Sequence, residues 1–414
     1  MPLTSEKSLP ADLEGMTDEE FLATRPRLGD FWTPVLYIER EALTHNLTVM
    51  QRWMDARGMD FMPHGKTTMA PALWQAQLDA GARGITLATP GQVRTALRHG
   101  VRTVMLANEI VSRPALQWIA GRLADPAVGF TCWTDSIEGI ERMESALGEL
   151  GTDLARPLDV LVELGAPGKR TGARDVEEAV AIAERLAASP VLRLAGVAGY
   201  EGAVAGRRSP EQAQVARSFV EQLVELHRRL APLYDDGEVM VTAAGSVYFD
   251  VVAEVFGAAR EEFPRTRWVL RPGAYIVHDH GLYERQSPLA GDEVPAEERL
   301  RPAVHAVAQV VSKPEPHLAY LDAGRRDLAF DSELPVALAY ARGLGKPWHP
   351  LEGAEVTKLN DQHAYVDLGP NTGVAVGDVI QLGMSHPCTM FDKWRVIPVV
   401  DDDGTVVGLV RTYF

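Results

Sequence analysis

A regular alternation of short apolar segments with helical segments is the feature that most constrains the fold of this chain. Eight apolar segments of four to seven residues recur between residues 59 and 271. They are Met59–Met62, Gly84–Thr89, Thr103–Ala107, Val128–Thr134, Asp159–Leu164, Leu194–Tyr200, Val239–Ala243 and Arg267–Arg271. Segments of this length are typical of buried strands, and the intervals have the apolar spacing of amphipathic helices. Eight such units predict an α/β protein with a closed (β/α)8 barrel of the TIM type rather than an open doubly wound sheet.

The intervals between these strands carry the helical pattern. The predicted helices include Ala70–Ala80, Pro90–Arg98, Ser112–Leu123, Ser136–Leu150, Asp175–Ala188 and Pro210–Leu233. A further helix is predicted to open at the pair Gly245-Ser246, after the seventh strand. No Gly-x-Gly-x-x-Gly sequence follows the first strand, which weakens a dinucleotide-binding interpretation.

The pattern changes after Leu300, where strands separated by Gly, Pro and Asp replace the helices. These strands include His305–Val311, Ala319–Ala323, Ala364–Leu368, Val379–Leu382, Trp394–Val400 and Val406–Phe414. This texture predicts a mainly antiparallel β domain of roughly 115 residues. We expect residues 1–32 to form a leader, residues 39–300 the barrel, and residues 33–38 together with 301–414 the β domain.

Charge and composition exclude several classes of protein. The chain has 414 residues, of which 46% are hydrophobic and 24% charged, as in folded soluble proteins. Its formal charge of −16 argues against nucleic acid and anionic membrane as partners, because phosphate groups would repel it. No apolar run is long enough to span a bilayer, the first residues lack the apolar core of a signal peptide, and only two cysteines occur. We therefore expect a cytoplasmic protein.

Polar residues follow the ends of the predicted strands, where a (β/α)8 barrel places its active site. The first strand ends in the run Pro63-His64-Gly65-Lys66-Thr67-Thr68. A lysine at this position can present its amine to a cleft, and a lysine amine is the group that captures the aldehyde of pyridoxal phosphate. Lys66 is therefore the candidate catalytic and cofactor-binding residue. The alternative is an ordinary solvated lysine.

Two other strand ends offer groups that could bind a phosphate or the rest of a cofactor. Gly245 and Ser246 could hold a phosphate through backbone N–H groups and a hydroxyl, and the alternative is an ordinary helix cap. After the eighth strand, Gly273 would allow a close backbone approach and Tyr275 would supply a phenol hydrogen bond. The alternative for this pair is a turn followed by a core tyrosine.

Arg170 and Tyr200 are candidates for contacts with the cofactor ring or the substrate. Arg170 follows the fifth strand within the glycine-rich run 165–172 and could neutralise a phenolate or carboxylate oxygen. Tyr200 ends the sixth strand and could lie flat against an aromatic ring. The alternatives are a solvated loop arginine and a core tyrosine.

The segment Met384-Ser385-His386-Pro387-Cys388 is a candidate metal site. Residues two apart in an extended segment point to the same side, so His386 and Cys388 can bind one ion together. Imidazole and thiolate favour zinc, and two protein ligands leave positions open for water and substrate, as at a catalytic metal. A chance pairing of the two residues is the alternative. The other cysteine, Cys132, lies in a barrel strand and is predicted to be a core residue.

Taken together, these segments resemble those of the fold-type III pyridoxal phosphate enzymes, the family of alanine racemase. More narrowly, they resemble its D-serine dehydratase and D-threonine aldolase branch, and the resemblance runs from Thr33 to the end of the chain. It rests on Thr33-Pro34, His64-x-Lys66-Thr67, Gly199-Tyr200-Glu201-Gly202, Arg271-Pro272-Gly273-x-Tyr275, Leu321-Asp322-Ala323-Gly324 and His386-x-Cys388.

The resemblance implies a barrel that holds pyridoxal phosphate on Lys66, a β domain that completes the site, and a homodimer whose subunits complete each other's active sites. It also implies that His386 and Cys388 bind zinc at the leaving hydroxyl, because the aldolase branch more often carries His-x-Asp. The expected activity is dehydration and deamination of a D-serine-like β-hydroxy D-amino acid to a 2-oxo acid and ammonia. The alternatives are retro-aldol cleavage to glycine and an aldehyde, as by D-threonine aldolase, and a non-catalytic pyridoxal phosphate-binding protein.

Overall fold

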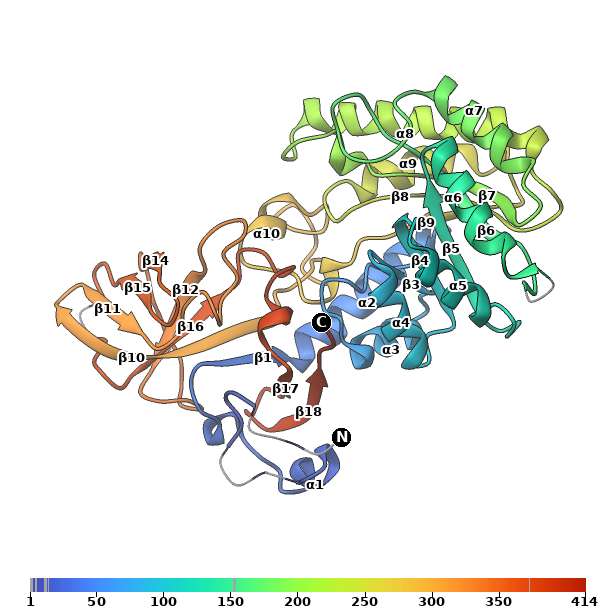
Figure 1. Ribbon diagram of the computed structural model, residues 1–414. Helices are drawn as coiled ribbons and strands as arrows, with labels where there is room; N and C mark the ends of the chain where they lie inside the picture. The colour runs from blue at the N-terminus through green and yellow to red at the C-terminus, as the bar shows by residue number, and fades with distance from the viewer. Residues whose placement is uncertain (1–2, 4–5, 11–12, 14, 152–153, 372) are drawn as a thin grey trace. The chain divides into compact units, whose positions relative to one another are not determined.

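The chain divides into two compact units, which are described separately. The computed structural model describes residues 3, 6–10, 13, 15–151, 154–371 and 373–414. The barrel unit comprises Met50–Lys66 and Trp74–Gly273, and the β-sheet unit comprises residues 1–49, Thr67–Leu73 and Ala274–Phe414. Figure 1 shows the elements of both. None of the helices in these described ranges combines the length and the apolarity that crossing a membrane requires.

Eight parallel strands form the sheet of the barrel unit (Figure 1). They are β2 (Asp60–Phe61), β3 (Ile85–Leu87), β4 (Thr103–Glu109), β5 (Gly129–Thr134), β6 (Leu158–Leu164), β7 (Leu192–Gly199), β8 (Val239–Ala243) and β9 (Thr266–Leu270). Hydrogen-bonded neighbours follow the order β2-β9-β8-β7-β6-β5-β4-β3. The two ends of this order meet where His64, just beyond β2, pairs in parallel with Thr86 of β3. The predicted (β/α)8 barrel is therefore confirmed.

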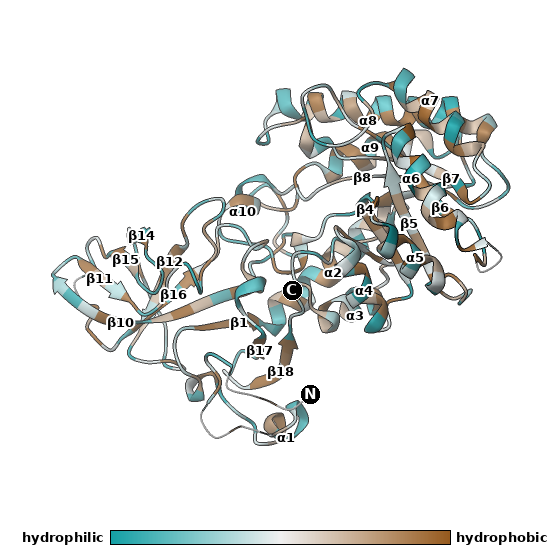
Figure 2. Ribbon diagram, viewed as in Figure 1, coloured by the Kyte–Doolittle hydropathy of each residue, from teal (hydrophilic) through white to brown (hydrophobic). Residues whose placement is uncertain are grey.

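Helices separate the strands, as the apolar spacing predicts. They are α3 (Pro71–Asp79), α4 (Pro90–Arg98), α5 (Arg113–Arg122), α6 (Ile137–Gly148), α7 (Val176–Ala187), α8 (Pro210–Leu230) and α9 (Phe249–Ala259). Side-chain caps begin four of them, since Thr89, Ser136, Asp175 and Ser209 each accept a backbone N–H from three residues later. Figure 2 shows apolar and polar stretches alternating along α7 and α8. One predicted boundary is wrong: α9 begins at Phe249, so a turn rather than a helix follows Gly245-Ser246.

A layer of apolar side chains fills the interior of the barrel. Its buried members are Met62, Met105, Trp133, Leu161, Ala195, Ala198, Met240 and Val269. Because side chains alternate along a strand, residues an even number of positions further on face the same interior. Towards the carboxyl ends of the strands these residues are polar, and they are His64, Glu109, Asp135, Glu163, Tyr200, Thr242 and Arg271. The core therefore supports a polar layer at the end of the barrel where such folds bind ligands.

The second sheet has ten strands in the described residues. They are β1 (Val35–Glu39), β10 (Val304–Glu315), β11 (Leu318–Leu321), β12 (Val336–Ala341), β13 (His349–Pro350), β14 (Glu355–Leu359), β15 (Ala364–Asp367), β16 (Val379–Gly383), β17 (Val396–Val400) and β18 (Val406–Arg411). The main order is β13-β12-β16-β10-β1-β17-β18, and β11, β15 and β14 continue from β10. The predicted antiparallel β domain is confirmed, with one parallel pairing, between β1 and β17.

β1 lies inside this sheet although it precedes the barrel in sequence, because it pairs antiparallel with β10 and parallel with β17. The N-terminal segment packs against the same core through the buried residues Leu3, Leu9, Phe21, Leu28 and Phe31. Helix α1 (Asp18–Ala23) begins with a capping box formed by Thr17 and Glu20. The first part of α2 (Arg40–Arg57), the first residues of α3 and all of α10 (Leu282–Gln286) also belong to this unit.

Helix α6 offers a matched test of which residues stabilise the barrel. Ile140 is fully buried, whereas Ile137, one turn earlier, is 40% exposed. Ile140→Ala should lower the free energy of unfolding by about 2–5 kcal/mol, because the change leaves a cavity in the core. Ile137→Ala should lower it by less than about 1 kcal/mol. Urea denaturation measures both values, and equal losses would contradict the packing described for α6.

Candidate active site

The turn after β2 places Lys66 at the carboxyl end of the first barrel strand. His64 continues the strand by pairing with Thr86, and Lys66 follows two residues later. Gly65 is fixed between them: its carbonyl accepts a hydrogen bond from Trp74 Nε1 at 3.1 Å, and a Cβ on Gly65 would lie 2.5 Å from that nitrogen. Lys66 itself is exposed. The lysine thus lies where the sequence predicts it, and its role as the cofactor lysine stays a prediction.

Positive charge converges on His64. Burial lowers the pKa of His64 well below its usual value, and the charges of Lys66, Arg271 and Arg170 lower it further. The ring nitrogen Nδ1 is buried and has no hydrogen-bond partner among the described residues. Three cations near a neutral imidazole create a region of positive potential, which suits an anionic ligand. The phosphate and phenolate groups of pyridoxal phosphate fit this region.

Arg271 supplies a buried guanidinium at the end of β9. It is 2% exposed and donates from Nη1 to Thr242 Oγ1 and from Nη2 to the Gly199 carbonyl, both at 2.8 Å. Its Nε is buried without a partner in the described part of the chain, and burial lowers the pKa of Arg271 to about 10. The sequence motif contains Arg271, but no role was predicted for it. The sequence does contain a signal for this position. Arg271 is two residues beyond Val269 of the interior layer, so strand alternation directs its side chain into the barrel.

The structure brings together two predicted residues, Arg170 and Tyr200. The guanidinium carbon of Arg170 lies 4.7 Å from the centroid of the Tyr200 ring. Two glycines lie close to the same ring: a Cβ on Gly202 would be 2.5 Å from Tyr200 Cζ, and a Cβ on Gly245 would be 2.7 Å from Cε2. The tyrosine therefore packs against bare backbone on one part of its surface and meets a cation on another. This arrangement can sandwich or flank a planar ring.

A second arginine shapes the loop that carries Arg170. Arg174 Nη1 donates to the carbonyls of Ala166 at 2.9 Å and Arg170 at 2.8 Å. The loop is closed at its base, where Gly165 N–H donates to the Ala173 carbonyl at 2.8 Å. Arg170 is exposed at the tip of this closed loop, so its side chain can reach a ligand while its backbone stays in place.

The turn after β8 differs from the prediction in how its backbone is used. The N–H of Gly245 donates to Glu201 Oε1 at 2.8 Å, so in this structure it is already paired. Ser246 is half-buried in the same turn. Its hydroxyl and N–H have no partner among the described residues. At this turn, therefore, Ser246 rather than Gly245 offers the donors that a phosphate requires.

Gly273 and Tyr275 lie on opposite sides of the division between the units. In the barrel unit, a Cβ on Gly273 would lie 2.4 Å from the His64 carbonyl oxygen, so only glycine allows this approach. In the β-sheet unit, Tyr275 belongs to the 3-10 helix η5 (Ala274–Ile276) and is 3% exposed. The close approach predicted for Gly273 is thus made to the protein's own backbone, next to the predicted site.

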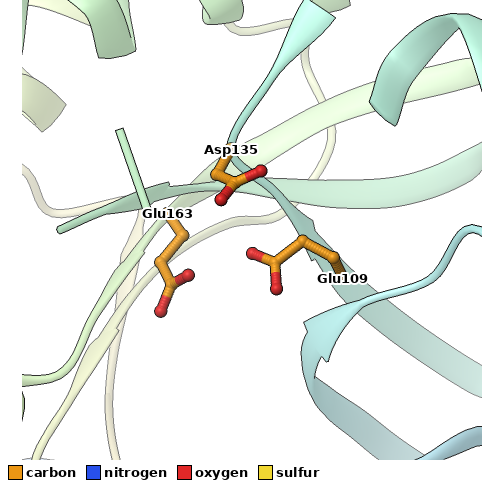
Figure 3. Close-up of side chains that lie close together, drawn as sticks. All are labelled: Glu109, Asp135 and Glu163. Atoms are coloured by element: carbon orange, nitrogen blue, oxygen red, sulfur yellow. The ribbon is translucent and has the colours of Figure 1, made fainter. Parts of the chain in front are cut away.

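Three carboxylates occupy the barrel end, in β4, directly after β5 and in β6. Figure 3 shows the side chains of Glu109, Asp135 and Glu163 directed toward one another, and one oxygen from each lies within 4.8 Å of the others. Asp135 Oδ2 accepts the Gly172 N–H at 3.0 Å. Burial, and next the Glu163 carboxylate, raise the pKa of Glu109 to about 8. Glu109 is therefore mostly protonated at neutral pH. Sequence reasoning missed this cluster.

His386 and Cys388 have the chemistry of a metal-binding pair. His386 Nδ1 lies 2.6 Å from Asp331 Oδ2, and Asp331 Oδ1 accepts from Thr389 Oγ1 at 2.6 Å. Burial alone would lower the pKa of His386, but the Cys388 sulfur and the Asp331 carboxylate raise it to about 9. A carboxylate on Nδ1 orients the ring and leaves Nε2 for an ion, as in many metal sites. The donors present therefore fit one divalent metal, and Asp331 is a supporting residue that the sequence did not indicate.

The fold and these sites define a class of protein: a (β/α)8 barrel with a strand-end lysine, joined to an antiparallel sheet, as in alanine racemase. Two family models match the chain, "Alanine racemase, N-terminal domain" over residues 38–235 and "Putative serine dehydratase domain" over residues 303–400. The chain belongs to the fold-type III pyridoxal phosphate family.

Several known proteins are similar along most of their length. D-threonine aldolase of Arthrobacter sp. is 26% identical over 89% of both chains. D-threo-3-hydroxyaspartate dehydratase of Delftia sp. (strain HT23) is 26% identical over 56% of this chain and 64% of its own length. The crystal structure of D-threonine aldolase from Filomicrobium marinum matches with a TM-score of 0.77 at 24% identity, covering 93% of this chain and 95% of that one.

Glu109→Gln tests the raised pKa of Glu109. The folded-state pKa of Glu109, about 8, exceeds the ordinary value of 4.5, so between these values only the folded chain keeps the proton. The stability that this group contributes is complete below the lower value and is lost as the pH rises through the higher one. Glutamine cannot ionise, so between about pH 5 and pH 9 the variant should lose less free energy of unfolding than the unchanged protein, by about 1 kcal/mol or more. Urea denaturation at several pH values measures this difference, and parallel pH curves would rule out the raised pKa.

Proposed function

We propose that this chain is a pyridoxal phosphate- and metal-dependent lyase that dehydrates and deaminates a D-serine-like β-hydroxy D-amino acid. The observation that carries the proposal is Lys66 at a barrel strand end where the charges of Arg170 and Arg271 also converge. A second observation supports it. Thr67, the residue after Lys66, lies with its Oγ1 at 3.5 Å from the Cys388 sulfur.

The barrel residues fit the handling of a cofactor and of one proton. When bound, pyridoxal phosphate draws electrons from the substrate α-carbon and makes its proton acidic. Lys66 would hold the cofactor and, once displaced by the substrate amine, would remove the α-proton. Arg170 and Arg271 would balance negative charge, and Tyr200 would pack against the ring. Ser246 would bind the phosphate through its hydroxyl and N–H.

The metal pair fits the second half of the reaction. His386 and Cys388 would hold a divalent ion, and imidazole with thiolate favours zinc. Such an ion supplies Lewis acidity to the β-hydroxyl when it is bound. Loss of the α-proton and of this hydroxyl removes one water across the Cα–Cβ bond. The enamine that results tautomerises and takes up water, which releases a 2-oxo acid and ammonia.

Solved structures of D-threo-3-hydroxyaspartate dehydratase variants support a His-x-Cys metal site. One carries a histidine-to-alanine change, and another carries an alanine in place of the cysteine two positions later and is in the metal-free form. The same spacing occurs here in His386-Pro387-Cys388. By this resemblance we further propose a cytoplasmic homodimer in which each subunit completes the other's site.

A retro-aldol lyase is the second candidate. It is favoured by relatives named D-threonine aldolase and 3-hydroxy-D-aspartate aldolase, each 26% identical. In that reaction a base takes the proton of the β-hydroxyl, the Cα–Cβ bond breaks, and the products are glycine and an aldehyde. Cys388 at the second metal position favours dehydration, because a carboxylate is more usual there in the aldolase branch. A non-catalytic pyridoxal phosphate-binding protein would leave the metal pair without a task.

Lys66→Ala should prevent covalent attachment of the cofactor. After incubation with pyridoxal phosphate and borohydride, the unchanged protein should gain the mass of one reduced cofactor on the peptide that contains Lys66. The Lys66→Ala variant should gain none, whereas Lys169→Ala, in the exposed tip of the 165–172 loop, should behave like the unchanged protein. Mass spectrometry of the peptides measures this. Labelling of another lysine in the unchanged protein would remove Lys66 from the proposal.

Cys388→Ala should abolish dehydration and leave the cofactor bound. The unchanged protein with D-serine should release a 2-oxo acid and ammonia, and the variant should release less than about a hundredth as much, since a missing Lewis acid leaves hydroxide as a poor leaving group. Cys132→Ala removes the other thiol, which is fully buried in β5, and should keep the activity. Undiminished dehydration by Cys388→Ala would remove the metal from the mechanism. Glycine as the main product from D-threonine would favour the aldolase.

A further inference from the structure

Glu201 is a fully buried carboxylate to which the proposed function assigns no role. It begins the 3-10 helix η3 (Glu201–Ala203) directly after β7 and is 0% exposed. Burial raises the pKa of Glu201, because the charged form is poorly solvated there. A buried carboxylate persists only where its partners compensate for the lost water. Its partners therefore indicate what it does.

Both oxygens of Glu201 bind one turn of the backbone, between β8 and α9. Oε2 accepts the Ala244 N–H at 3.0 Å, and Oε1 accepts the Gly245 N–H at 2.8 Å. Hydrogen bonds from N–H groups to a carboxylate are stronger than those between neutral groups. Glu201 thus accepts hydrogen bonds from two successive residues of a turn that lies more than forty residues away in the sequence.

The turn at Ala244 and Gly245 needs these two hydrogen bonds because its backbone conformation is strained. Ala244 has a φ of 81°, a backbone conformation that costs energy for any residue with a Cβ. Gly245 lies so close to the Tyr200 ring that a Cβ on it would be 2.7 Å from Cε2. Ala244 is 1% exposed and cannot relax outward. The two bonds to Glu201 offset the cost of this conformation.

The two residues after Gly245 offer backbone N–H donors that no described residue accepts. The N–H groups of Ser246 and Val247 have no hydrogen-bond partner within the described residues, and helix α9 begins only at Phe249. Their direction is set by the two residues before them. If the turn relaxed at Ala244, the N–H groups of Ser246 and Val247 would turn with it.

We infer that Glu201 is the positioning residue of the phosphate-binding turn: it holds Ala244 and Gly245 so that Ser246 and Val247 present their donors to the cofactor phosphate. This inference rests on the proposed function. Glutamine cannot replace Glu201, because its amide has one oxygen for two N–H groups and sets an NH2 donor against the other.

The test compares pyridoxal phosphate with pyridoxal, which lacks the phosphate. Fluorescence titration of the cofactor-free full-length protein gives the Kd of each, and their ratio measures what the phosphate contributes. Glu201→Gln should weaken pyridoxal phosphate binding by at least about tenfold and change pyridoxal binding by less than about twofold, since one charge-assisted bond is lost at the turn. Adding Ala244→Gly to Glu201→Gln should recover part of the loss, because glycine adopts the required φ without strain.

Asp125→Asn is the matched control. Asp125 Oδ1 accepts the Ala127 N–H at 2.9 Å before β5, so the change also turns a backbone-binding carboxylate into an amide. It should leave the ratio unchanged. An unchanged ratio for Glu201→Gln, or equal weakening of both ligands, would overturn the positioning role. If the unchanged protein shows no preference for the phosphorylated form, the proposed function itself fails. Thermal unfolding of each variant shows whether it is folded. If Glu201→Gln alone does not fold, the two Kd values are measured on the double variant Glu201→Gln with Ala244→Gly instead.

Discussion

The apolar layer inside the barrel is the constraint on which the candidate site depends. Met62, Trp133, Leu161 and their neighbours fill the interior, and the alternation of side chains then directs the next inward residues of each strand to the same end. Several of those residues are ionisable, and Glu163 and Arg271 are buried, where electrostatic interactions are stronger than at the surface. Each such charge must be balanced by a neighbour, by a proton or by a ligand.

Three carboxylates and the guanidinium of Arg271 come from different strands at this end of the barrel. Glu109 ends β4, Asp135 follows β5 directly, and Glu163 lies in β6, so the three carboxylates come from consecutive strands. The guanidinium of Arg271 follows β9, which pairs with β2, the strand that leads to Lys66. The proton that Glu109 keeps at neutral pH reduces the repulsion among the acids. On the other side Arg271 is not fully paired, and an anionic ligand would complete it.

The sequence predicts the barrel well because its signal is local and periodic. All eight strands and the position of Lys66 follow from short apolar segments and their ends. The strands β13 and β14 escape prediction because β13 has two exposed residues and β14 is mostly polar and exposed. β12 is not among the predicted strands although its six residues are apolar. The roles of Glu201 and Asp331 could not be predicted either, since their partners lie 44 and 55 residues away. The turn at Gly245-Ser246 has the composition of a helix start, but the N–H groups of Ala244 and Gly245 bind Glu201, and the helix begins only at Phe249.

The visible absorption spectrum of the purified protein, followed during addition of β-hydroxy amino acids, tests the central claim most directly. We expect a pyridoxal phosphate band that shifts on addition of D-serine, D-threonine or D-3-hydroxyaspartate, together with release of a 2-oxo acid from at least one of them. The L-enantiomers should leave the band unchanged. A protein that takes up no pyridoxal phosphate, or a band that responds equally to both enantiomers without any product, would contradict the account.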